Sequence, residues 1–148
     1  MQLGVLFEVV PSTVDEPPRG DETPADYAVR LAKLKAREVA ERPGIDAHVL
    51  GADTVVVVDG DVLGKPADVA DARAMMARLC GRRHEVITGV CIVAPGGAED
   101  AFHVATRVWF RDVDTEAQRR YADSGEGLDK AGAYAIQGLG AGLVERIE

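Results

Sequence analysis

The sequence has few aromatic residues, few cysteines and no long apolar run. Phe, Trp and Tyr make up 5% of its 148 residues, so we expect a core of aliphatic side chains and alanine. Its two cysteines, Cys80 and Cys91, are too few for a disulfide framework and form no CxxC motif. No apolar stretch approaches the roughly 18 residues of a membrane span. These features, with no secretory signal in view, predict reduced thiols, no membrane association and a cytoplasmic location.

Basic residues are also scarce, because 17 Lys and Arg face 25 Asp and Glu, for a net charge of −8. Such an acidic chain lacks the basic footprint of a nucleic-acid-binding protein, so no nucleic-acid partner is expected. A small anionic substrate remains compatible, since carboxylates can hold a divalent cation that supplies local positive charge. Four lysines stand among thirteen arginines. These lysines would be explained if a compact point charge is needed at their positions. The alternative is random sequence drift in a chain that favours Arg.

The order of elements predicts one domain of class α/β or α+β, with two hairpins and a mixed sheet. Thr23 followed by Pro24 and Asp26 is typical of a helix start, and Asp59-Gly60 of a tight hairpin turn. Thr115 and Gln118 have the spacing of a capping box for a helix that starts at Asp114 or Thr115. The remaining strands are expected at Leu6–Val10, Val49–Val58, Val62–Leu63, Glu85–Val93, Phe102–Phe110 and Leu143–Ile147, and the other helices at 24 to about 43 and at Val69–Leu79.

Three segments could carry chemistry. Asp53 precedes a run of four valines, where a carboxylate is either bound structurally or kept for metal and proton chemistry. Gly64-Lys65-Pro66 presents a cation on a tight turn, although most exposed lysines only aid solubility. The glycine-rich segment 125–138 carries Asp129, Lys130 and Gln137, and is otherwise an ordinary loop. Walker, nucleophile-elbow, zinc, calcium and Rossmann motifs are absent from the sequence, so a metal-dependent phosphate substrate suits these residues better than acyl transfer or redox chemistry.

Seven ordered blocks over nearly the whole chain carry a resemblance to a known family. They are Phe7–Glu16, Arg30–Ala32 with Lys35-Ala36, Gly51–Val56, Leu63–Pro66, Leu79–Arg82 with His84–Val86 and Thr88–Val90, Thr106–Val108 with Phe110-Arg111, and Gly125–Gly138. The chain resembles the Maf-type nucleoside triphosphate pyrophosphatases, house-cleaning enzymes related in fold to inosine triphosphatase. Three of the four lysines fall inside these blocks. The resemblance implies a twisted mixed sheet flanked by helices.

The resemblance also implies an activity and a set of site residues. The reaction is hydrolysis of dTTP or UTP, or of modified pyrimidine nucleotides, to a monophosphate and pyrophosphate with Mg²⁺ or Mn²⁺. Asp53 is the proton acceptor and a metal ligand, and Glu16 is a second metal or water partner. Lys35 and Lys65 meet the phosphates. Thr54 and Gln137 match positions that set base preference, in the branch acting on dTTP and UTP rather than on 7-methyl-GTP.

The chain departs from the family pattern at both ends. The resemblance implies one domain over 1–148 without the family's first strand, its Ser-x-Arg-Arg phosphate loop and its last helix. The alternative function is therefore a weakly active or non-catalytic nucleotide-binding protein that regulates septum formation. Without a first strand, the edge beside Val55–Val58 is expected to be open or to pair with another segment, which invites a homodimer or aggregation.

Overall fold

The structure, a computed structural model, describes residues 4–148 and contains a five-stranded sheet of order β2-β1-β3-β4-β5 with antiparallel neighbours. The strands are β1 (Val49–Val58), β2 (Asp61–Leu63), β3 (Arg83–Val93), β4 (Glu99–Phe110) and β5 (Val144–Ile147). The helices are α1 (Pro24–Ala40), α2 (Val69–Leu79) and α3 (Thr115–Asp123), with 3₁₀ turns η1 (Ala131–Ala133) and η2 (Leu139–Leu143). The predicted α/β class, with helices flanking a sheet, is confirmed. The expectation of a mixed sheet was wrong, because every pair of neighbouring strands among the described residues is antiparallel.

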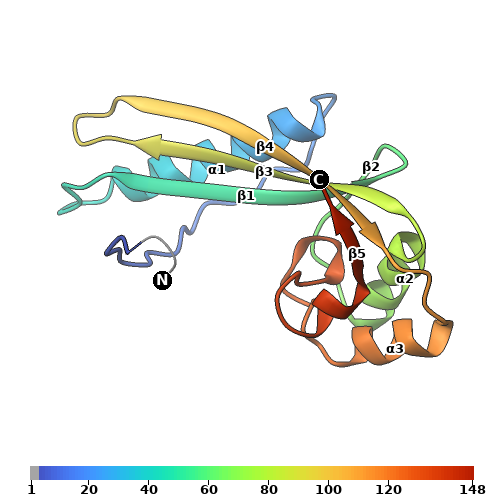
Figure 1. Ribbon diagram of the computed structural model, residues 1–148. Helices are drawn as coiled ribbons and strands as arrows, with labels where there is room; N and C mark the ends of the chain where they lie inside the picture. The colour runs from blue at the N-terminus through green and yellow to red at the C-terminus, as the bar shows by residue number, and fades with distance from the viewer. Residues whose placement is uncertain (1–3) are drawn as a thin grey trace.

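The two halves of the long strands have different neighbours (Figure 1). At one end, β1, β3 and β4 extend together and α1 lies along one of their faces. At the other end, α2, α3, η1 and η2 pack around the main hydrophobic cluster, which includes Val56, Met76 and Phe110. Within residues 4–148, no helix is long and apolar enough to cross a bilayer.

Helix α1 approaches the sheet very closely because glycine and alanine line the contact. A Cβ atom added to Gly51 would lie 2.6 Å from the Ala32 carbonyl oxygen, and one added to Gly89 would lie 2.3 Å from the Ala28 carbonyl carbon. Ala28, Ala32 and Ala36 follow one another at four-residue spacing on the buried side of the helix. The helix backbone therefore rests almost directly on β1 and β3.

Several local signals act as expected. The Thr23 hydroxyl caps α1 by accepting a hydrogen bond from the Asp26 amide at 3.1 Å. Asp59 and Gly60 both have positive φ, at 52° and 84°, which is the geometry of a two-residue hairpin turn between β1 and β2. The expected C-terminal strand is present as β5 and pairs with the end of β4.

Two further expectations were wrong. Leu6–Val10 is not a strand, since no segment of the described residues 4–148 pairs with it and Leu6 is 92% exposed. The capping box at Thr115 does not form: Asp114 is the N-cap of α3, and the Gln118 side chain donates to the Val113 carbonyl instead. The edge of β1 is not open beside its apolar end, because β2 pairs with Val56–Val58.

Candidate active site

A lysine and two carboxylates meet at the boundary of α1 and β1. The Lys35 Nζ lies 2.6 Å from Asp53 Oδ1 and 2.6 Å from Glu16 Oε1. Asp53 lies two residues after Gly51, so the close helix approach at that glycine brings the α1 side chain within direct reach of the strand. The Asp53 side chain is 12% exposed, Lys35 is 22% exposed and Glu16 is 45% exposed. The cluster is therefore buried on the β1 side and open to solvent on the Glu16 side.

Glu16 reaches the cluster because the segment before α1 runs back along the helix. Near the C-terminal end of α1, Glu38 accepts hydrogen bonds from the Ser12 hydroxyl at 2.8 Å and the Thr13 amide at 3.1 Å. These bonds and the ion pair with Arg42 lower the pKa of Glu38 to about 2, with Arg42 the largest cause. About one turn earlier on the helix, Glu16 meets Lys35.

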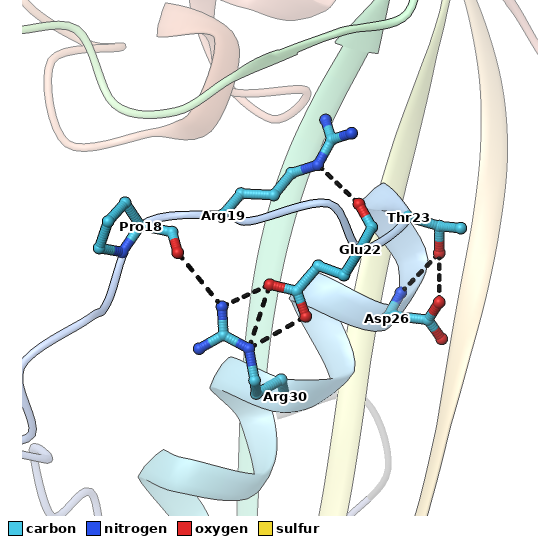
Figure 2. A network of polar contacts seen from close by, with 6 residues as sticks. All are labelled: Pro18, Arg19, Glu22, Thr23, Asp26 and Arg30. Atoms are coloured by element: carbon cyan, nitrogen blue, oxygen red, sulfur yellow. Dashed lines mark hydrogen bonds and ion pairs between the residues drawn. The ribbon is translucent and has the colours of Figure 1, made fainter.

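A second network anchors the same segment at the start of α1 (Figure 2). The Glu22 carboxylate accepts from Arg30, with Nε to Oε2 at 3.0 Å, and the Arg19 Nε donates to the Glu22 carbonyl oxygen. The hydrogen bond from Arg30 is the main reason that the pKa of Glu22 is lowered. The segment that carries Glu16 is thus tied to α1 on both sides of that residue.

The electrostatics of the cluster favour a charged lysine beside a more basic aspartate. Burial opposes the charge on Lys35, but its hydrogen bonds to Asp53 and Glu16 outweigh this and raise the pKa of the ammonium. Burial is also the largest influence on Asp53 and raises the pKa of this carboxyl, against the lowering effect of Lys35. Because one ammonium serves two carboxylates, it cannot fully offset the burial of Asp53. A raised pKa makes a carboxylate a better proton acceptor near neutral pH.

Thr54 lies on the opposite face of the sheet from this cluster. Consecutive strand residues point to opposite faces, and Asp53 points toward α1. Thr54 instead faces Thr88 of β3, with 2.9 Å between their hydroxyl oxygens. Within residues 4–148, β2 pairs with β1 only at Val56–Val58, so Asp53 and Thr54 lie where that edge of β1 has no strand beside it. Thr54 is exposed on its face of the sheet, and Asp53 is partly buried on the other.

The other expected site residues lie on the turn after β2 and on the loop between η1 and η2. Lys65 follows β2 and is exposed, and its charge lowers the pKa of Asp53 as a minor contribution. The Gly132 amide donates to the Gly64 carbonyl at 2.9 Å, which ties the turn carrying Lys65 to η1. Gln137 is exposed in the loop between η1 and η2. The structure therefore joins Lys35, Asp53 and Glu16 directly and leaves Lys65, Thr54 and Gln137 outside that contact.

The acidic pair fits a small divalent cation in part. In the portion of the chain that the structure describes, no three His, Cys, Asp or Glu side chains gather as a metal-binding group. Asp53 and Glu16 nevertheless contact the same lysine nitrogen, so their oxygens are near one another. Mg²⁺ commonly binds one or two carboxylates, with water and substrate phosphate oxygens completing the shell. The donor set is therefore compatible with Mg²⁺ held jointly with a phosphate ligand.

Sequence reasoning missed the residues that support the site. Glu22 and Arg30 are eight residues apart, and Glu22 lies outside the helix, so no periodic pattern joins them. Glu126 accepts hydrogen bonds from the amides of Leu139 and Gly140 beyond Gln137. The density of glycines in 125–140 was a usable signal for that packing, because a Cβ at Gly138 would lie 2.3 Å from Glu126 Oε1.

Comparison with known proteins gives the class. The model of the family described as Maf-like protein matches residues 1–148, and the chain belongs to this family. A dTTP/UTP pyrophosphatase of Hahella chejuensis is 50% identical over 99% of this chain and 73% of its own length. The dTTP/UTP pyrophosphatase of Symbiobacterium thermophilum is also 50% identical, over 99% of this chain and 74% of its own.

A solved structure shows a weaker likeness. The nucleoside-triphosphatase, dITP/XTP pyrophosphatase, of Mycobacterium abscessus matches with a TM-score of 0.41 and 18% identity over 68% of this chain and 56% of that chain.

Proposed function

We propose that this protein is a nucleoside triphosphate pyrophosphatase that hydrolyses dTTP and UTP to the monophosphate and pyrophosphate. The contact of Lys35 with Asp53 and Glu16 carries the proposal, because it unites a proton acceptor, a cation and a second carboxylate beside an accessible strand edge. Membership of the Maf-like family and the activity for which relatives at 50% identity are named support the choice of reaction and substrates. The non-catalytic alternative is not favoured, since those relatives are named as enzymes.

In the proposed reaction, Asp53 accepts a proton from the attacking water while the bond between the α- and β-phosphates breaks. Its burial supports this role by raising the pKa of the carboxyl. Lys35 and Lys65 offset the phosphate charge. Asp53 and Glu16 would hold Mg²⁺ or Mn²⁺, which would neutralise charge on the phosphate oxygens when bound. Pyrophosphate leaves as the second product, so atoms balance with one water consumed.

The geometry supports a substrate that lies across the edge of β1. Its phosphates occupy the α1 side, near Lys35 and Asp53, and its base occupies the other side, near Thr54. Gln137 offers an amide donor and acceptor that suit the imide edge shared by uracil and thymine. The proposed location is the cytoplasm, where nucleoside triphosphates are present. The protein is proposed to act there without a nucleic-acid partner.

The test is pyrophosphate release with Mg²⁺ and, in separate assays, UTP, dTTP, CTP, ATP and 7-methyl-GTP. We expect UTP and dTTP to be preferred and Asp53→Asn to abolish turnover without unfolding the chain. Asp100→Asn, at an exposed carboxylate on β4, is the matched control and should retain activity. Preference for 7-methyl-GTP or ready use of ATP would contradict the proposal. Binding of UTP without hydrolysis would favour the non-catalytic alternative.

A further inference from the structure

The loop that carries Gln137 is anchored on both sides by one pair of side chains. Two residues before Gln137, the Ala135 amide donates to the Tyr121 hydroxyl at 3.0 Å. Two residues after it, the Leu139 amide donates to Glu126 Oε1 at 2.9 Å, and the Gly140 amide donates to Oε2 at 2.9 Å. The two anchors are connected, because the Tyr121 hydroxyl donates to Glu126 Oε2 at 3.0 Å.

Packing leaves this loop little freedom to take another path. Gly138 has a φ of 96°, and a Cβ there would lie 2.3 Å from Glu126 Oε1. A Cβ on Gly140 would lie 2.1 Å from the Ala135 carbonyl oxygen and 2.9 Å from the Tyr121 hydroxyl. The backbone therefore wraps closely around the carboxylate and the phenol.

The charge state of the anchor suits this role. The amide hydrogen bonds from Leu139 and Gly140 are the main causes that lower the pKa of Glu126, so the carboxylate stays ionised. Burial raises the pKa of Tyr121 to about 12, so its hydroxyl keeps the proton that it donates. An ionised acceptor gives shorter and stronger hydrogen bonds than a neutral one.

We propose that Glu126, with Tyr121, is a positioning residue. It fixes the backbone around Gln137, holds the side-chain amide of Gln137 in place and thereby sets the preference for uracil and thymine. This inference rests on the proposed function and adds a residue that contacts no substrate. Gln137 is itself exposed and lies midway between the anchored amides of Ala135 and Leu139. Loss of the anchor should lower the selectivity for UTP over CTP more than it lowers the rate of hydrolysis.

The first test is a double-mutant cycle on selectivity. We compare the ratio of kcat/KM for UTP to that for CTP in the parent chain, Glu126→Gln, Gln137→Ala and the double variant. Glu126→Gln should lower the ratio by about tenfold, as loss of one hydrogen bond to the base would. Glu126→Gln should lower this ratio mainly by raising KM for UTP. In the Gln137→Ala background, it should change the ratio little further. Glu145→Gln, at an exposed carboxylate on β5, is the control.

The second test does not depend on turnover. Hydrogen exchange of the Leu139 and Gly140 amides should be roughly tenfold to a hundredfold faster in Glu126→Gln, because each loses a charged acceptor. Unchanged exchange would overturn the anchoring. Equal loss for UTP and CTP, or full additivity with Gln137→Ala, would overturn the link to base selection. If the parent chain releases no pyrophosphate, the proposed function and base selection both fail, while exchange still decides the anchoring.

Discussion

Acidification should destabilise this protein through a single buried histidine. His84 on β3 is 2% exposed, packs edge-on against Phe110 and Tyr134, and shares a 2.8 Å hydrogen bond between its Nε2 and the Tyr134 hydroxyl. Its Nδ1 has no hydrogen-bond partner in the described residues. Burial lowers the pKa of His84 from 6.5 to about 4. The folded state therefore holds the imidazole neutral under conditions where the unfolded chain protonates it.

The sign and size follow from proton linkage. Between pH 6.5 and 4 the unfolded state binds more protons at this residue, so the free energy of unfolding falls as the pH falls. With these two values the loss is about 1.5 kcal/mol between pH 6.5 and pH 5, and about 3 kcal/mol in total by pH 4. Glu38 acts in the same direction only at lower pH, below its ordinary value of 4.5. The raised pKa of Asp53 acts in the opposite direction.

Urea unfolding at half-unit steps from pH 7 to pH 5 measures this effect. The parent chain should lose stability steadily over the lower part of that range. His84→Gln should flatten the curve, since glutamine does not titrate, whereas His103→Gln on exposed β4 should leave the slope unchanged. A parent chain whose stability changes by less than about 0.5 kcal/mol between pH 6.5 and pH 5 would refute the reasoning, because linkage then requires equal proton binding in both states.

Three further outcomes are expected. Gly89→Ala should lower the free energy of unfolding by about 1–3 kcal/mol or more in urea, because the new Cβ would collide with the backbone at Ala28; Gly142→Ala, with nothing within 4 Å, should be tolerated. Cys80 should react with a thiol reagent at pH 8 only after unfolding, since burial raises its pKa to about 11, and rapid reaction of the folded chain would contradict this. Glu22→Gln should speed proteolysis within residues 15–21 with little change in Tm, which follows if a partly exposed ion pair holds a loop rather than the core.

The fold was predictable wherever a local rule and the tertiary structure agree. The Thr23 cap, the Asp59-Gly60 turn and the strand Val49–Val58 all depend on residues close in sequence, and each is observed. Leu6–Val10 has the composition of a strand but pairs with no segment in the part of the chain that the structure describes, and pairing is a tertiary property that composition does not contain. At the start of α3, both Asp114 and Thr115 are suitable N-cap residues, and the carboxylate of Asp114 is the one that caps the helix.

The contact of Lys35 with Asp53 and Glu16 could not be predicted from sequence spacing, and the roles that the family resemblance implies for these residues stay predictions. Glu16 lies in an irregular segment, and its contact with Lys35 depends on hydrogen bonds made at Glu38 and Glu22 on either side. Such long-range anchoring leaves no periodic trace in a sequence. The opposite orientation of Asp53 and Thr54, by contrast, follows from strand alternation alone.

The glycine and alanine contact under α1 has a consequence for how the helix is held in register. Ridges of large side chains normally interlock two packed elements and resist sliding, whereas a smooth surface of Gly51, Gly89 and small alanines offers little such resistance. Polar contacts across the interface, such as Lys35 with Asp53, must then fix the axial position of the helix. A ligand that draws Lys35 away from Asp53 would also remove a contact that opposes sliding of α1 along the sheet. Ligand binding at this edge and movement of α1 along its axis would therefore be thermodynamically linked.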